Sequence, residues 1–158
     1  MSKNTRFLTH AAVIAALYAV LTHLQNVLLP GSTTWAIQMR LSEALCVLSF
    51  FTPAAIPGLT VGCLVFNITY AAALPLDFLV GSLATLLAAG CMWLTRHVTV
   101  KGYPLPGMAM PALFNALLVG WELTAYIGGG FFLNALYVAL GELAVLLTFG
   151  TVLFYAVK

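Results

Sequence analysis

Long apolar runs fill most of the sequence, and they constrain the fold more than any other feature. Charged residues make up only 6% of the chain, whereas a soluble domain carries about 25%. With so few charged side chains, the protein cannot cover a surface that faces water. The sequence therefore predicts an integral membrane protein in contact with the lipid bilayer.

Breaks that contain proline or glycine divide the apolar runs into six candidate spans. A helix needs about 20 apolar residues to cross the hydrocarbon core of a bilayer. Pro30-Gly31 and the glycines at 128–130 are examples of the breaks. We therefore expect one transmembrane domain, 1–158, folded as an all-α six-transmembrane-helix bundle with both termini in the cytoplasm. The expected spans are 7–29, 36–51, 54–71, 77–96, 108–127 and 131–156.

The basic residues set this orientation, because Lys and Arg gather on the cytoplasmic side of membrane proteins. With the N-terminus inside, the basic residues on that side are Lys3, Arg6, Arg96, Lys101 and Lys158. Arg40 alone is expected on the outer side. It lies in the segment "IQMRLSEAL", which also carries Gln38 and Glu43.

The acidic residues are expected in the outer half of the membrane or at its midplane. They are Glu43, Asp77, Glu122 and Glu142. A charged side chain at the bilayer centre costs about 2.5–3.5 kcal/mol, so a carboxylate at this depth needs a partner or water. Arg40 can satisfy only one or two of them. We therefore predict a polar cavity that opens to the outside.

The last two spans repeat a pattern in which an amide precedes a carboxylate. Asn115 precedes Glu122, and Asn134 precedes Glu142, by two helical turns on one helix face. Because these helices run in opposite directions, we expect Asn134 near Glu122, with Asn115 and Glu142 deeper. Two interpretations stay open: a two-tier binding stripe, or hydrogen bonds that only hold the helices together.

Further polar and aromatic residues are expected around the same outer face. Trp and Tyr at helix ends commonly form an interfacial belt, and Arg40 and Glu43 have the spacing to pair on one helix face. These structural roles are alternatives to ligand contact. The predicted substrate-binding residues are Trp35, Gln38, Arg40, Glu43, Asn67, Asp77, Asn115, Trp121, Glu122, Asn134, Tyr137 and Glu142.

The sequence contains no common enzyme or nucleotide-binding motif. It lacks the zinc-protease, serine-hydrolase, Walker A and dinucleotide patterns, and its cysteines and histidines do not have metal-ligand spacing. We therefore expect a transport protein rather than an enzyme, with no cofactor and no metal. Energy for pumping would then come from a partner or an ion gradient.

The first span carries a strip of small residues, Ala11, Ala15 and Ala19, on which another helix can pack closely. With this strip, six spans and a polar outer cavity, the chain resembles the substrate-binding (S) components of energy-coupling factor (ECF) transporters. More narrowly, "IQMRLSEAL", "FFTPAAIPGL", "GSLATLLAA" and "NALYVALGEL" are similar to the QueT family.

The resemblance implies a multi-pass protein of the bacterial plasma membrane that works with partners. These are a transmembrane coupling subunit and two cytoplasmic ATPases, together with a small-molecule substrate and the bilayer, and no nucleic acid. In S components the alanine strip docks against the coupling subunit, which gives this role to Ala11, Ala15 and Ala19. The ligand is expected near the outer face, between the first loop and helices four to six.

The family name points to a queuosine precursor, a 7-deazaguanine base. A carboxylate can accept hydrogen bonds from the N–H and exocyclic amine of such a base, and an aminomethyl form adds a cation. Glu122 and Glu43 are therefore the first candidates to hold the donors, followed by Asp77. Asn134, Gln38 and Asn115 would orient the ligand. Glu142 is expected to be structural, either paired with Arg40 or protonated.

Other functions stay open at this point. Some QueT-like proteins are associated with cobalamin, so an S component for cobalamin or another vitamin is one alternative. The outer loops are short, whereas cobalamin would need a wide, shallow cavity with long loops, and this favours the base. A stand-alone channel or secondary transporter could use the same carboxylates for ions or protons.

Overall fold

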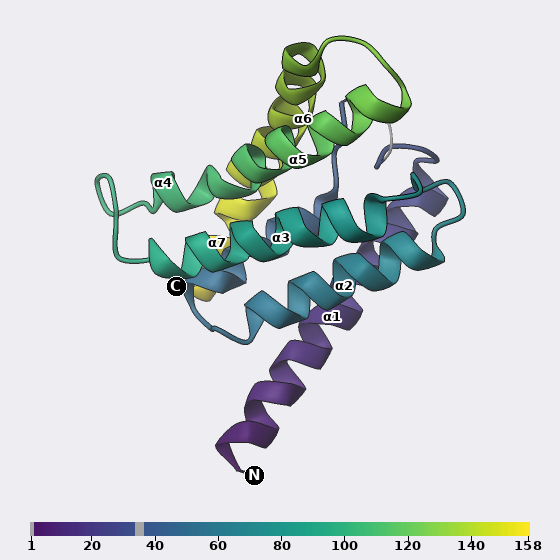
Figure 1. The fold of residues 1–158 in the computed structure, drawn as a ribbon. Helices are drawn as coiled ribbons and strands as arrows, with labels where there is room; N and C mark the ends of the chain where they lie inside the picture. The colour runs from purple at the N-terminus through teal and green to yellow at the C-terminus, as the bar shows by residue number, and fades with distance from the viewer. Residues whose placement is uncertain (1, 34–36) are drawn as a thin grey trace.

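The computed structural model describes residues 2–33 and 37–158 (Figure 1). No strand occurs in this part of the chain, and Val100 and Tyr103 form an isolated bridge. The expected all-α class is confirmed. The helices are α1 (Lys3–Leu28), η1 (Leu41–Phe50), α2 (Ala55–Thr69), α3 (Asp77–Leu94), α4 (Leu105–Met108), α5 (Met110–Tyr126), α6 (Phe131–Val145), η2 (Leu146–Gly150) and α7 (Thr151–Val157).

Four helical stretches in the described residues are long and apolar enough to cross a membrane. They are Lys3–Leu28, Asp77–Leu94, Leu105–Tyr126 and Phe131–Val157, in the places expected for the first, fourth, fifth and sixth spans. The second and third expected spans are shorter apolar helices, η1 with 10 residues and α2 with 15. The count of six spans and the orientation of the termini stay predictions.

The second span differs from the prediction in its helix type. η1 is a 3₁₀ helix, and residues 37–40 before it belong to no helix. A 3₁₀ helix rises about 2.0 Å per residue, so ten residues extend about 20 Å, compared with about 15 Å as an α-helix. The stretched helix partly compensates for the short segment.

Glycines in α2 allow α1 to pack closely against it. A Cβ on Gly58 would lie 2.8 Å from the Ala11 carbonyl oxygen, and one on Gly62 would lie 2.7 Å from the Ala15 carbonyl oxygen. Residues early in α1 therefore face residues early in α2, so the two helices run in the same direction. η1 returns the chain between them and contacts α1, α2, α3, α6, η2 and α7.

Five of the six basic residues lie at one end of the bundle, called here the basic end. The α3–α4 connection meets the C-terminal helix there, since Tyr103 Oη is 2.6 Å from Thr151 Oγ1 and its ring packs on Phe154. The parallel course of α1 and α2 places the N-terminus toward the same end (Figure 1). The basic end thus holds Lys3, Arg6, Arg96, Lys101 and Lys158.

Arg40 lies at the opposite end, called here the Arg40 end. This end also contains the α2–α3 and α5–α6 connections. Between the two ends, the outside of the long helices is apolar, and even large side chains such as Leu117 and Leu140 are exposed. Apolar surface of this extent is suited to lipid rather than to water.

Candidate functional site

The four acidic side chains of the protein all lie inside the helix bundle. Glu43, Asp77, Glu122 and Glu142 each expose at most 4% of their surface. Acidic side chains are almost never fully buried unless they are paired. The partners of these carboxylates therefore decide which of them is available to a ligand.

Arg40 forms a buried ion pair with Asp77, which joins the segment before η1 to the first turn of α3. Arg40 Nη2 lies 3.4 Å from Asp77 Oδ2. The guanidinium also lies 5.7 Å from the centre of the Phe66 ring, and its Nη1 is 3.9 Å from Cys63 Sγ. Arg40 is thus held in a slot between α2 and α3.

This ion pair corrects two expectations about Arg40. The suggested pairs with Glu43 and with Glu142 are not among the ion pairs of the described residues. A pair with Glu43 on one helix face requires both residues to be helical, but Arg40 has extended backbone angles (φ −93°, ψ 104°) and only precedes the helix. Its side chain instead reaches across to α3.

Glu43 is bound on both of its carboxylate oxygens by the protein itself. The Tyr18 hydroxyl donates to Oε1, and Cys46 Sγ lies 3.1 Å from Oε2. One residue earlier, Thr22 Oγ1 donates to Ser42 Oγ at 2.6 Å. These contacts tie η1 to α1, so Glu43 serves here as a structural anchor within the core.

A cavity of about 180 Å³ lies at the Arg40 end, and we call it the acidic cavity. Gln38 reaches it from the segment before η1, Asp77 from the start of α3, and Glu122 from α5. The remaining lining is apolar. The full lining is Gln38, Ala72, Leu74, Asp77, Val119, Glu122, Leu123 and Ile127.

Glu122 is the least satisfied group in this cavity. Its side chain is fully buried, and no described residue forms a hydrogen bond to either carboxylate oxygen. An unsatisfied buried polar group costs about 1–3 kcal/mol, and more when it is charged. Such a group in the wall of a cavity is a candidate to bind a ligand.

Asn67 supports the acidic cavity from α2 without lining it. Its Nδ2 donates to the Asp77 carbonyl oxygen at 2.8 Å. A Cβ on Gly81 would lie 2.8 Å from Asn67 Nδ2 and 3.2 Å from Asp77 Oδ1, so only glycine leaves room for this arrangement. Sequence reasoning missed Gly81, although a glycine one helical turn after Asp77 was an available signal.

The other predicted residues lie elsewhere. Asn134 Nδ2 donates to Thr124 Oγ1 at 2.9 Å and to the Gly128 carbonyl at 3.0 Å. Asn134 thus joins α6 to the end of α5 and, contrary to the expectation, does not bond Glu122. Trp121 is exposed and Tyr137 half-buried, and neither lines the acidic cavity.

Asn115 and Glu142 are buried and do not line the acidic cavity either. Asn115 Nδ2 and Glu142 Oε2 have no hydrogen-bond partner among the described residues. Trp35 lies outside the described residues.

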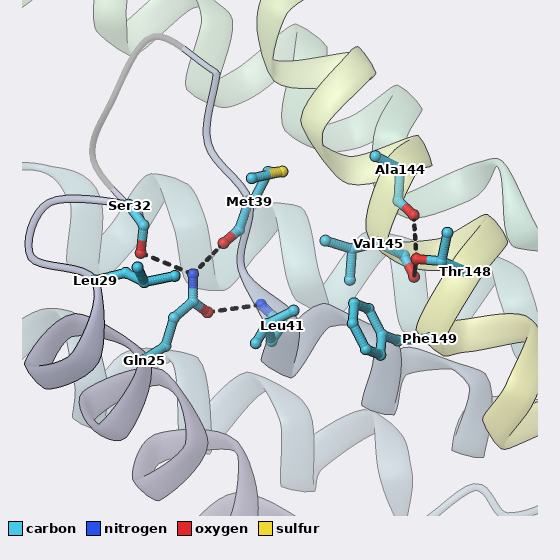
Figure 2. Close-up of a pocket in the computed structure, with 9 residues that line it drawn as sticks. All are labelled: Gln25, Leu29, Ser32, Met39, Leu41, Ala144, Val145, Thr148 and Phe149. Atoms are coloured by element: carbon cyan, nitrogen blue, oxygen red, sulfur yellow. Dashed lines mark hydrogen bonds between the residues drawn. The ribbon is translucent and has the colours of Figure 1, made fainter.

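A second cavity of about 210 Å³ lies between the end of α1 and the α6–η2 junction (Figure 2). Gln25 provides an amide there, and its hydrogen bonds are satisfied: Nε2 donates to Ser32 Oγ at 2.9 Å and to the Met39 carbonyl, and Oε1 accepts from Leu41 N at 2.8 Å. The lining is Gln25, Leu29, Ser32, Met39, Leu41, Ala144, Val145, Thr148 and Phe149. Because this crevice is mostly apolar, the acidic cavity is the better candidate for a polar ligand.

Comparison with known proteins agrees with a transport role. A family model described as "QueT transporter" matches residues 8–158, which is nearly the whole chain. No curated protein and no solved structure matches this chain. QueT proteins are S components of ECF transporters, and the helices of membrane-spanning length fit a multi-pass membrane protein. The chain therefore belongs to the QueT transporter family.

Proposed function

We propose that this S component captures a 7-deazaguanine precursor of queuosine outside a bacterial cell for ATP-driven uptake. Membership of the QueT family supports the transport role. The observation that carries the binding site is Glu122, a fully buried carboxylate in the wall of the acidic cavity with neither oxygen bonded by a described residue. The basic end faces the cytoplasm in this proposal, since Lys and Arg favour that side.

The chemistry of the acidic cavity suits such a base. Glu122 can accept charge-assisted hydrogen bonds from the ammonium group of an aminomethyl form of the base. Gln38 offers both a donor and an acceptor, and Val119 and Leu123 provide apolar contact for the ring.

The size of the cavity also favours a small ligand. Its volume of about 180 Å³ lies below the range of about 300–1,000 Å³ that is typical of drug-sized ligands. A bicyclic base is therefore a better match for the cavity than a corrinoid. Cobalamin is the alternative substrate. Native mass spectrometry of the purified protein distinguishes the two by the mass of any retained molecule.

Uptake would require the coupling subunit and two ATPases as separate chains. The proposed docking surface is the shallow apolar groove between α1 and α2, which includes Ala11 and Ala15. Ala19 is buried and lies outside the groove lining. The groove residues are Leu8, Ala11, Ala12, Ala15, Pro57 and Val61. Uptake by vesicles that contain this chain without ATPases would instead indicate a secondary transporter.

The substrate site is tested by titrating the purified protein with 7-aminomethyl-7-deazaguanine. Glu122→Gln should weaken binding about tenfold or more, because it removes a charge-assisted hydrogen bond while keeping the shape of the side chain. Thr148→Val, in the apolar crevice, is the matched control and should bind normally. Unchanged affinity in Glu122→Gln would contradict the assignment, and a loss in Thr148→Val would move the site to the crevice.

A further inference from the structure

The two carboxylates of the acidic cavity differ in their partners. Asp77 has a counter-ion, since its Oδ2 lies 3.4 Å from Arg40 Nη2. Glu122 has no ion-pair partner among the described residues. One cation against two carboxylates leaves one negative charge without compensation.

The remaining charged groups do not alter this balance at the cavity wall. Glu43 is engaged by Tyr18 and Cys46, and Glu142 is buried on α6 away from the cavity wall. Neither lines the cavity. Of the lysines and arginines in the described ranges, all except Arg40 are at the basic end. Glu122 is therefore the carboxylate of the acidic cavity that has no counter-ion among the described residues.

We infer that the acidic cavity selects its ligand by charge and prefers a small organic monocation to a neutral molecule of the same shape. Asp77 is already paired with Arg40. Glu122 is therefore the counter-ion of the ligand, and the cavity binds one positive charge. This inference rests on the proposed function, because it takes the acidic cavity as the substrate site. A desolvated carboxylate strongly favours a cationic partner, since hydrogen bonds between charged groups are about twice as strong as neutral ones.

Two probes test the selection: 7-aminomethyl-7-deazaguanine, which carries an ammonium group, and 7-hydroxymethyl-7-deazaguanine, which carries a neutral hydroxyl in the same place. Titration of the purified protein in detergent should show that the amine binds about tenfold or more tightly. In Glu122→Gln the difference should shrink to about threefold or less, because the counter-ion is lost.

A charge series separates Glu122 from Asp77. Asp77→Asn leaves Arg40 and Glu122 to cancel each other, so the preference for the amine should disappear. The double variant Arg40→Gln/Asp77→Asn removes the ion pair but restores a single negative charge, so the preference should return. If Asp77 were the counter-ion of the ligand, the double variant would lose the preference.

The outcomes are distinct. Equal affinity of the wild-type protein for both probes would overturn charge selection and leave the proposed function standing. A preference that survives in Glu122→Gln would overturn the role of Glu122. Binding of neither probe would contradict the proposed function, and the inference would fail with it. Asp77→Asn leaves a buried cation unpaired and can prevent folding; in that case Glu122→Gln and the double variant decide, each first checked by size-exclusion chromatography.

Discussion

At the scale of single residues, burial gives the carboxylates different roles. Sequence reasoning placed Gln38, Asp77 and Glu122 among the candidate ligand contacts, because polar groups at membrane depth need a partner, and these three line the acidic cavity. Sequence reasoning could not assign the partner of each carboxylate. Arg40 and Asp77 are 37 residues apart, and so are distant in sequence but paired in the fold.

The anchoring role of Glu43 makes a prediction about stability. In Tyr18→Phe, Glu43 Oε1 loses its donor while it stays buried, which should destabilise the protein by about 1–3 kcal/mol. The expected result is a lower melting temperature in detergent with ligand affinity nearly unchanged, because Glu43 does not line the acidic cavity. Tyr155→Phe, at an exposed tyrosine, is the control and should melt like the wild-type protein. A large loss of affinity in Tyr18→Phe would place Glu43 in the binding site.

At the scale of elements, apolar run length predicted the long helices well. The 3₁₀ conformation of η1 was missed, because apolar periodicity over ten residues does not separate a 3₁₀ helix from an α-helix. The amide–carboxylate pattern gave the helices but not the lateral direction of each side chain. Asn134 therefore bonds Thr124 instead of completing a stripe with Glu122.

The contact between α6 and the segment that carries Gln38 gives a second prediction. Gly141 packs directly against the Gln38 carbonyl, so a Cβ there would collide with the backbone. Gly141→Ala should displace Gln38 and Arg40 and speed ligand dissociation. Gly130→Ala is the control, since a Cβ there meets no atom within 4 Å. Dissociation kinetics measured by stopped flow check this, and equal rates in the two variants would contradict a role for the contact.

At the scale of the whole molecule, the charge pattern of the sequence corresponds to a separation in space. Basic residues gather at the basic end, while the acidic cavity lies at the Arg40 end. Sequence alone could indicate this separation, since each span reverses the direction of the chain. It could not reveal the groove between α1 and α2, which depends on their close approach at Gly58 and Gly62.

The groove leads to a prediction about assembly. Ala12 is exposed on α1 and lines the groove, so Ala12→Trp should fill it and prevent association with the coupling subunit. Ala15 is a less clean target, because it is only partly exposed and its backbone packs against α2. Val20→Trp, exposed on α1 outside the groove lining, is the matched control. Co-purification with the coupling subunit measures the effect, and normal recovery of Ala12→Trp would refute this docking surface. Ligand binding by the isolated chain should be the same in both variants.

The helix type of η1 also limits how this protein can vary in length. With three residues per turn, each residue inserted into or deleted from η1 rotates everything before it by about 120° relative to everything after it. Phe50 at its far end is packed edge-on against Phe154, with ring centres 6.0 Å apart, and so resists turning. A single insertion would therefore swing Arg40 away from Asp77. Between these two fixed points the number of residues is therefore as constrained as their identity.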